Sequence, residues 1–127
     1  MFTGIIEEMG RLVHIEQDRG NTHFKIEANM SSELKIDQSL AHDGCCLTVT
    51  NVDENTYEVT AIQETLSCTT LGNWKLNTMI NLERCMKYDG RFDGHIVQGH
   101  VDCTAICEEV TEKDGSCLLY TSDAADE

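Results

Sequence analysis

The sequence predicts an all-β fold, either a small closed barrel or a sandwich. Short segments rich in Val, Ile, Thr and Tyr recur along the chain, and clusters of Gly, Asn and Asp separate them. Helical patterns are confined to two brief stretches. Many short strands accompanied by one or two short helices are typical of closed barrels and sandwiches.

The expected elements follow one another in a regular order. Strands are expected where β-branched and aromatic residues gather, at residues 10–15, 22–28, 45–51, 56–62 and 79–84. Turns rich in Gly, Asn and Asp separate them, at residues 18–21, 42–44, 51–55 and 72–73. Helical turns are expected at residues 31–34, with Ser31 as the N-cap, and at 64–71.

The length and charge of the chain limit its class. Its 127 residues suit one domain, or one small domain with an unfinished neighbour. The 9 Lys and Arg face 23 Asp and Glu, a net charge of −14, and no segment gathers the basic residues into a patch. Nucleic acids and anionic membranes need clustered cations, so we expect neither as a partner. No apolar run approaches the roughly 20 residues of a membrane span, and no basic leader precedes the first apolar residues, so we expect a soluble, cytoplasmic protein.

The seven cysteines are expected to be reduced thiols. Their number is odd and no secretion signal accompanies them, which argues against a disulfide framework. Four residues of zinc-binding types lie close together in the sequence, namely His95, His100, Cys103 and Cys107. Their spacing matches no common zinc pattern, so we expect no metal site.

A weak internal repeat with an offset of 95 residues indicates two copies of one barrel. Gly4-Ile5-Ile6-Glu7 and Gly99-His100-Val101-Asp102 both place a Gly, an aliphatic residue and an acid in the same order. The segment between the copies holds two Asp-Gly pairs, which favour a turn or linker. We therefore expect a first barrel at residues 1–87, a linker at 88–94 and the start of a second barrel at 95–116.

Residues 117–127 abandon the strand period and match no part of a second barrel. Their order resembles the in-frame translation of a sequencing adapter, so we expect a non-native tail. A loose acidic terminus is the alternative interpretation. Both interpretations leave the tail without a function.

The strand expected at 45–51 offers a candidate binding surface. Cys46, Thr48 and Thr50 share one face of it, and thiol and hydroxyl groups there would suit the polar edge of a heterocycle. Thr is equally a common outward residue of strands, and free Cys is often a small buried hydrophobe.

Two further places could contact a ligand. Glu64 and Thr65 follow the strand at 56–62 and could exchange hydrogen bonds with a flat ring, or could be a solvated acid and the start of a helix. His100 stands between Gly99 and Val101 and could either move protons near neutral pH or be structural.

Five motifs together resemble the riboflavin synthase alpha family in order and spacing, from Met1 to about Val110. They are Met1-Phe2-Thr3-Gly4-Ile5-Ile6, residues 41–50, Glu64-Thr65-Leu66 with Thr70-Leu71-Gly72, residues 80–84, and residues 94–102. The resemblance implies two tandem six-stranded Greek-key barrels with short helical turns, the second of them incomplete here. For complete members it also implies a C-terminal helix that assembles a homotrimer.

The resemblance implies a transferase of riboflavin biosynthesis that needs no metal or redox cofactor. Each barrel would bind one 6,7-dimethyl-8-ribityllumazine. Two lumazines would meet between the first barrel of one subunit and the second barrel of another, and dismutate into riboflavin and 5-amino-6-ribitylaminouracil. Because the second half-site is missing here, we expect binding of lumazine or riboflavin with little or no synthase activity, and a dimer of first barrels as one way to replace the missing partner.

The resemblance also implies roles for single residues. Cys46 is the candidate contact or nucleophile, and His100 the candidate proton shuttle. The candidate substrate-binding residues are Gly4, Ile5, Ile6, Cys46, Leu47, Thr48, Thr60, Ala61, Ile62, Gln63, Glu64, Thr65, Gly99, His100 and Val101. A non-catalytic lumazine or flavin carrier with the same fold is the alternative function, and a small interaction module without a ligand is the third.

Overall fold

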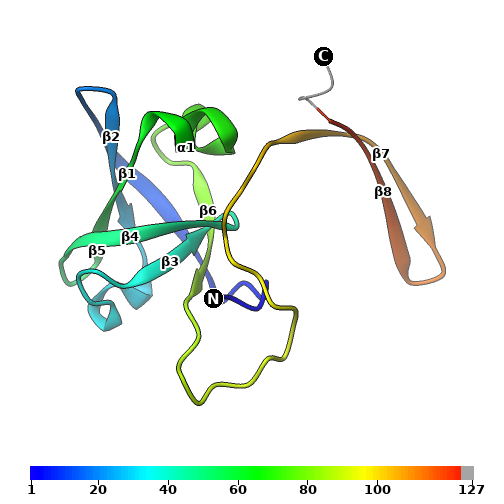
Figure 1. Ribbon diagram of the computed structural model, residues 1–127, viewed down its shortest axis with the longest axis horizontal. Coiled ribbons are helices and arrows are strands. Elements are labelled where there is room, and N and C mark those ends of the chain that lie inside the picture. The colour runs from blue at the N-terminus through cyan, green and yellow to red at the C-terminus, as the bar shows by residue number, and fades with distance from the viewer. Residues whose placement is uncertain (124–127) are drawn as a thin grey trace.

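Six strands close into an antiparallel barrel in the computed structural model, which describes residues 1–123 (Figure 1). The barrel strands are β1 (Glu8–Asp18), β2 (Asn21–Glu27), β3 (Ser39–His42), β4 (Cys45–Val52), β5 (Thr56–Ala61) and β6 (Met79–Arg84). Their order around the barrel is β1-β2-β5-β4-β3-β6, so β2 pairs with β5 and β3 with β6 across longer connections. This Greek-key arrangement confirms the predicted six-stranded barrel.

The period-two pattern of the strands separates the barrel interior from its outer face. In β5 the side chains of Tyr57, Val59 and Ala61 are buried, whereas Glu58 and Thr60 between them are partly exposed. The same alternation operates in β4, where Cys45, Leu47 and Val49 are buried. The apolar side chains of all six strands therefore meet in one core, which excludes water from the barrel interior.

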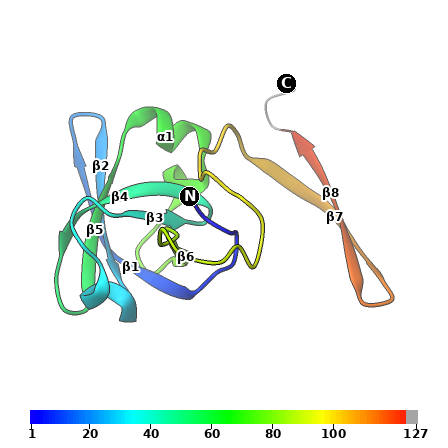
Figure 2. The ribbon, with the colours of Figure 1, turned by 60° about the horizontal axis from the view of Figure 1, so that its bottom comes forward.

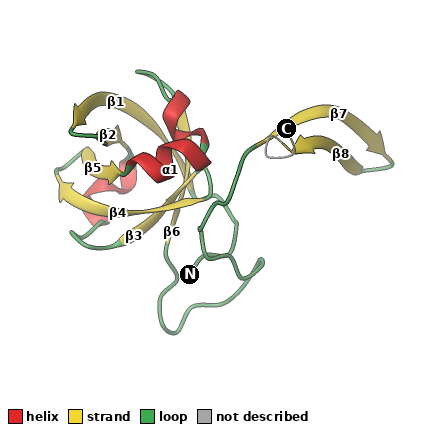
Figure 3. Cartoon of the chain, turned by 45° about the horizontal axis from the view of Figure 1, so that its top comes forward, coloured by secondary structure: helices red, strands yellow, loops and turns green. Residues whose placement is uncertain are grey.

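Short helices connect the strands, close to where the sequence predicts them (Figure 3). They are η1 (Asn29–Glu33), α1 (Gln63–Cys68) and η2 (Thr70–Asn73). The predicted cap at Ser31 is wrong, because η1 begins after Ala28 and the Ser31 side chain is buried. Within residues 1–123, no helix combines the length and the apolar character needed to cross a membrane.

A separate two-stranded hairpin of β7 (Ala105–Lys113) and β8 (Ser116–Asp123) lies to one side of the barrel (Figures 1 and 2). The sequence pattern does not predict β8, which covers much of the segment expected to be a tail. The turn supplies the physical reason: Asp114 and Gly115 have φ of 42° and 90°, and two positive φ values match the twist of paired strands. Residues 124–127 of the expected tail lie outside the described residues.

The β7–β8 hairpin repeats irregularities of the β1–β2 hairpin at the same offset of 95 residues. The β1 register shifts between Leu12 and His14, and the β7 register shifts between Cys107 and Glu109. The turns correspond as well, since residues 19 and 20 both have positive φ, as do residues 114 and 115. These coincidences support the interpretation of residues 95–116 as the start of a second barrel, which stays a prediction.

Candidate ligand-binding site

Three segments of the predicted site lie at one edge of the barrel. The backbone N–H of Cys46 donates a hydrogen bond to the Gly99 carbonyl over 2.8 Å, and Val101 packs against the barrel core. Residues 60–65 run from the end of β5, the neighbour of β4, into α1. We refer to residues 46–48, 60–65 and 99–101 together as the rim.

The rim forms where the β4–β5 ladder stops. The last register pair in this direction joins Val49 to Val59. Beyond that pair, the Cys46 N–H finds its acceptor in Gly99 instead of in a residue of β5. A chain segment that follows the linker thus takes a place beside β4 that a longer ladder would have filled.

Glycine is the residue type that fits at position 99, for two reasons. Its φ is +82°, a conformation that side chains with a Cβ rarely adopt. A Cβ here would also lie 2.9 Å from the Cβ of Cys46 and 3.1 Å from Cε2 of Phe2. The close approach of the 99–101 segment to β4 therefore depends on the missing side chain.

The rim residues differ in what they can offer to a ligand. Leu47 and Ala61 are buried in the core, so only their backbone can reach a ligand. The half-buried side chains are those of Cys46, Thr60, Thr65 and Val101, and the exposed ones are those of Thr48, Ile62, Gln63, Glu64 and His100. The rim therefore combines backbone groups, hydroxyls, a thiol and an imidazole above an apolar base, as small-molecule sites commonly do.

The two candidate catalytic residues both lie on the rim. Within residues 1–123 the structure shows no hydrogen bond between the side chains of Cys46 and His100. The neighbouring Cys45 is a poor nucleophile, because burial raises the pKa of its thiol to about 11. Of the two adjacent cysteines, Cys46 is therefore the one whose side chain could take part in chemistry.

Gly4, Ile5 and Ile6 do not join the rim by any hydrogen bond within residues 1–123. They follow Phe2, which exchanges backbone hydrogen bonds of 2.7 and 2.9 Å with Val97. Phe2 and Val97 are themselves related by the offset of 95 residues, so in the predicted repeat each copy would begin by pairing with the other. Gly4 corresponds to Gly99 in this arrangement, and both have positive φ.

Glu83 in β6 anchors this N-terminal segment, and the sequence analysis does not single it out. Its buried carboxylate accepts hydrogen bonds from the Thr3 N–H at 2.7 Å, the Thr3 hydroxyl at 2.8 Å and the Gly4 N–H at 2.9 Å. The period of two that buries Ile80 and Leu82 predicts an outward, exposed position for Glu83, so the sequence carries no signal for a carboxylate that the N-terminal segment buries. Buried charged groups are almost always paired.

Replacing Glu83 with Gln is expected to lower the free energy of unfolding by about 1–3 kcal/mol, because an amide nitrogen would face N–H donors that now have an acceptor. Urea unfolding of both proteins measures the difference. Glu33→Gln is the matched control, since Glu33 is exposed and lies 3.8 Å from Arg84. Equal losses in the two variants would show that Glu83 anchors nothing.

His42 lies under the turn before β4 and is fully buried. Its Nδ1 lies 2.9 Å from the Leu40 carbonyl oxygen, which can only accept, so Nδ1 carries the proton. The Tyr57 hydroxyl then donates to Nε2 over 2.8 Å. Burial lowers the pKa of His42 to about 4, which keeps this bridge between β3 and β5 neutral at physiological pH.

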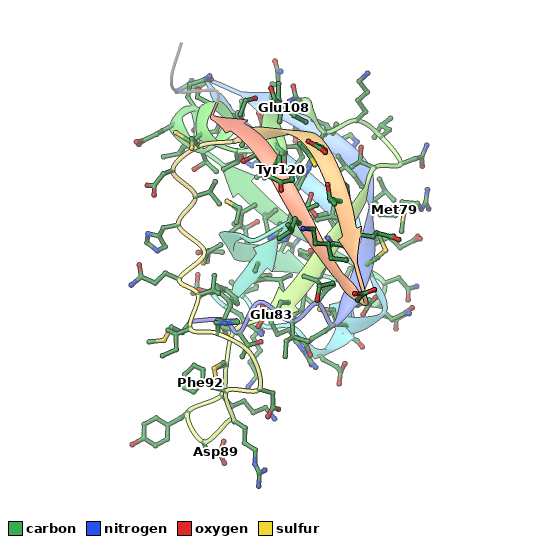
Figure 4. The ribbon with its side chains drawn as sticks, turned by 90° about the vertical axis from the view of Figure 1, so that its right-hand side faces the viewer. Met79, Glu83, Asp89, Phe92, Glu108 and Tyr120 are labelled. Atoms are coloured by element: carbon green, nitrogen blue, oxygen red, sulfur yellow. The ribbon has the colours of Figure 1, made fainter. Side chains whose placement is uncertain are left out.

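A groove of about 930 Å³ lies away from the rim, between the N-terminal segment and the loop that follows β6. Figure 4 shows Asp89 and Phe92 on this loop, which extends from the barrel near Glu83. Of the predicted site residues, only Ile5 lines the groove. Arg84 forms one wall, and its hydrogen bonds lower the pKa of Glu7. Within residues 1–123, no three His, Cys, Asp or Glu side chains are placed to hold a metal ion.

The fold and the rim together define the class of this protein, a small β-barrel that could hold a flat ligand at one edge. Comparison with known proteins makes the class specific: residues 3–85 match the lumazine binding domain. The chain belongs to the lumazine-binding domain family.

Its similar relatives include riboflavin synthases. The chain is 41% identical to that of Actinobacillus pleuropneumoniae over 112 residues, which are 87% of this chain and 52% of the relative. It is 38% identical to that of Escherichia coli over 94% of this chain and 57% of the relative. The chain thus spans about half the length of the curated relatives it matches.

Solved structures share the fold. LumP in complex with 6,7-dimethyl-8-(1'-D-ribityl) lumazine superimposes with a TM-score of 0.81 at 19% identity, over 95% of this chain and 68% of that one. LumP in complex with riboflavin gives a TM-score of 0.80 at 19% identity, over 95% and 66%.

Proposed function

We propose that the rim binds one ribityl-substituted bicyclic ring, either 6,7-dimethyl-8-ribityllumazine or riboflavin. The observation that carries the proposal is the hydrogen bond from Cys46 to Gly99, which brings two distant predicted segments to one edge of the barrel. The family match and the relatives named riboflavin synthase support this ligand class.

We propose further that the complete protein converts two lumazines into riboflavin and 5-amino-6-ribitylaminouracil. In this reaction the C7 methyl of one lumazine must lose a proton, and its carbanion attacks the second ring. The protein's part is to hold the two rings together and to move that proton. We assign the ring contact or nucleophile to Cys46 and the proton transfer to His100, both from the rim.

The pairing of Phe2 with Val97 suggests where the neighbouring residues Gly4, Ile5 and Ile6 act. Gly99 to Val101 complete the rim of the first barrel, which precedes them in the chain. By the offset of 95 residues, residues 4–6 would complete the corresponding rim of a second barrel. Within residues 1–123 that barrel is represented only by the β7–β8 hairpin, so turnover would need a second half-site from elsewhere, as in the homotrimer proposed for the complete protein.

The purified chain is expected to bind riboflavin saturably and to form little riboflavin from lumazine. Fluorescence titration measures binding, and absorbance of riboflavin measures turnover. Turnover at the rate of a complete riboflavin synthase would overturn the two-half-site proposal. The full-length version of this protein separates the synthase from the carrier: riboflavin formed from lumazine would support the synthase, and binding without turnover would support the carrier. Absence of any fluorescence change would leave only an interaction module.

A further inference from the structure

Three side chains joined by hydrogen bonds connect the end of β1 to the rim. His23 in β2 is the register partner of Thr60 in β5, and its Nδ1 lies 2.7 Å from the Thr60 Oγ1. Its Nε2 lies 3.3 Å from Oδ2 of Asp18 at the end of β1. Thr60 belongs to the rim, whereas Asp18 and His23 lie in a predicted turn and a predicted strand and are not among the candidate site residues.

The Asp18 carboxylate selects one tautomer of the His23 ring, and that tautomer sets the direction of both hydrogen bonds. An ionised carboxylate can only accept, so Nε2 carries a proton and donates to Asp18. In the tautomer whose single proton is on Nε2, Nδ1 accepts a hydrogen bond from the Thr60 hydroxyl. The Thr60 oxygen is left with lone pairs, which can accept a hydrogen bond from a ligand, but it has no proton to give.

We propose that His23, held by Asp18, is a positioning residue that makes Thr60 an acceptor for the hydroxyl groups of the ligand's polyol side chain. The inference rests on the proposed ligand class, because the ribityl chain consists of hydroxyl donors and carries no charge. An acceptor in an acidic chain of net charge −14 suits such a polyol better than it suits a phosphate or carboxylate.

The test compares riboflavin with lumiflavin, which has the same ring but a methyl group in place of the ribityl chain. Binding of each to the full 127-residue chain is measured by fluorescence quenching. His23→Leu is expected to weaken riboflavin binding roughly tenfold, the effect of one hydrogen bond, and to leave lumiflavin binding unchanged. His23→Asn should restore riboflavin binding, because its Oδ1 lies near the position of Nδ1 and can accept from Thr60.

His14→Gln is the matched control, a histidine on the adjacent strand β1 that is exposed and should affect neither ligand. If His23→Leu fails to fold, Thr60→Val must show the same selective loss of riboflavin affinity. Equal losses of affinity for both ligands, or no loss of affinity for riboflavin, would overturn the role of His23 and leave the proposed function standing. If the unaltered chain binds neither ligand, the proposed function itself fails.

Discussion

Lowering the pH from 7 to 5 is expected to reduce the free energy of unfolding by about 2 kcal/mol through His42 alone. The folded pKa of about 4 lies below the ordinary value of 6.5, so the unfolded chain binds more protons between these values. The stability is fully present above pH 6.5 and is lost progressively as the pH falls toward 4. Protonation would prevent Nε2 from accepting the hydrogen bond of the Tyr57 hydroxyl, and it would place a charge in the core.

Urea unfolding at pH 7 and pH 5 measures this loss, and the window avoids most of the titration of carboxylates. His42→Gln is less stable at pH 7, but its stability should depend less on pH. Where that variant is too unstable, the imidazole proton resonances of the unaltered chain give a second measurement, since His42 should not titrate between pH 7 and 5. A His42 resonance that titrates near pH 6.5 would contradict the prediction.

Gly99→Ala is expected to weaken riboflavin binding by at least roughly tenfold, because loss of the hydrogen bond to Cys46 would move the 99–101 segment off β4. The added Cβ would meet the Cys46 backbone nitrogen at 3.1 Å as well as its Cβ at 2.9 Å. A fixed backbone cannot easily give way at such distances. Fluorescence titration with riboflavin measures the effect on binding.

Gly20→Ala separates the clash from the cost of the backbone conformation. Gly20 has φ of +91°, and no atom lies within 4 Å of the place that an added Cβ would take, so this variant carries the left-handed cost of about 1–2 kcal/mol without a clash. It should lose stability and keep its riboflavin affinity. Similar affinities of the two variants would refute the idea that the 99–101 segment completes the site.

The strands with clear alternation could be predicted from the sequence, whereas β3 could not. Residues 39–42 are short, and three consecutive side chains, Leu40, Ala41 and His42, are buried, so no period of two exists. The sequence predicts His42 in a turn, whereas the structure buries it at the end of β3. Its burial could not be predicted, because it depends on a hydroxyl that β5 brings from fifteen residues away. The β8 strand depends on its pairing with β7 and on the turn before it, and not on its own pattern.

The candidate site could be predicted in part, because its residue types carry local motifs. The resemblance groups residues 4–6 with residues 99–101, whereas within residues 1–123 only the second of these segments forms a backbone hydrogen bond with β4. Glu83 and His23 escape the sequence analysis because their roles depend on partners at sequence separations of 80 and 37. Such roles become visible only when the barrel brings the strands together.

The order in which the chain is synthesised bears on the hydrogen bond between Cys46 and Gly99. All six strands of the barrel have been made once Arg84 leaves the ribosome, yet the partner of Cys46 is added fifteen residues later. A nascent barrel can therefore close before the proposed ligand site is complete. On the proposed function, ligand binding would begin only after the segment that holds Gly99 has been translated.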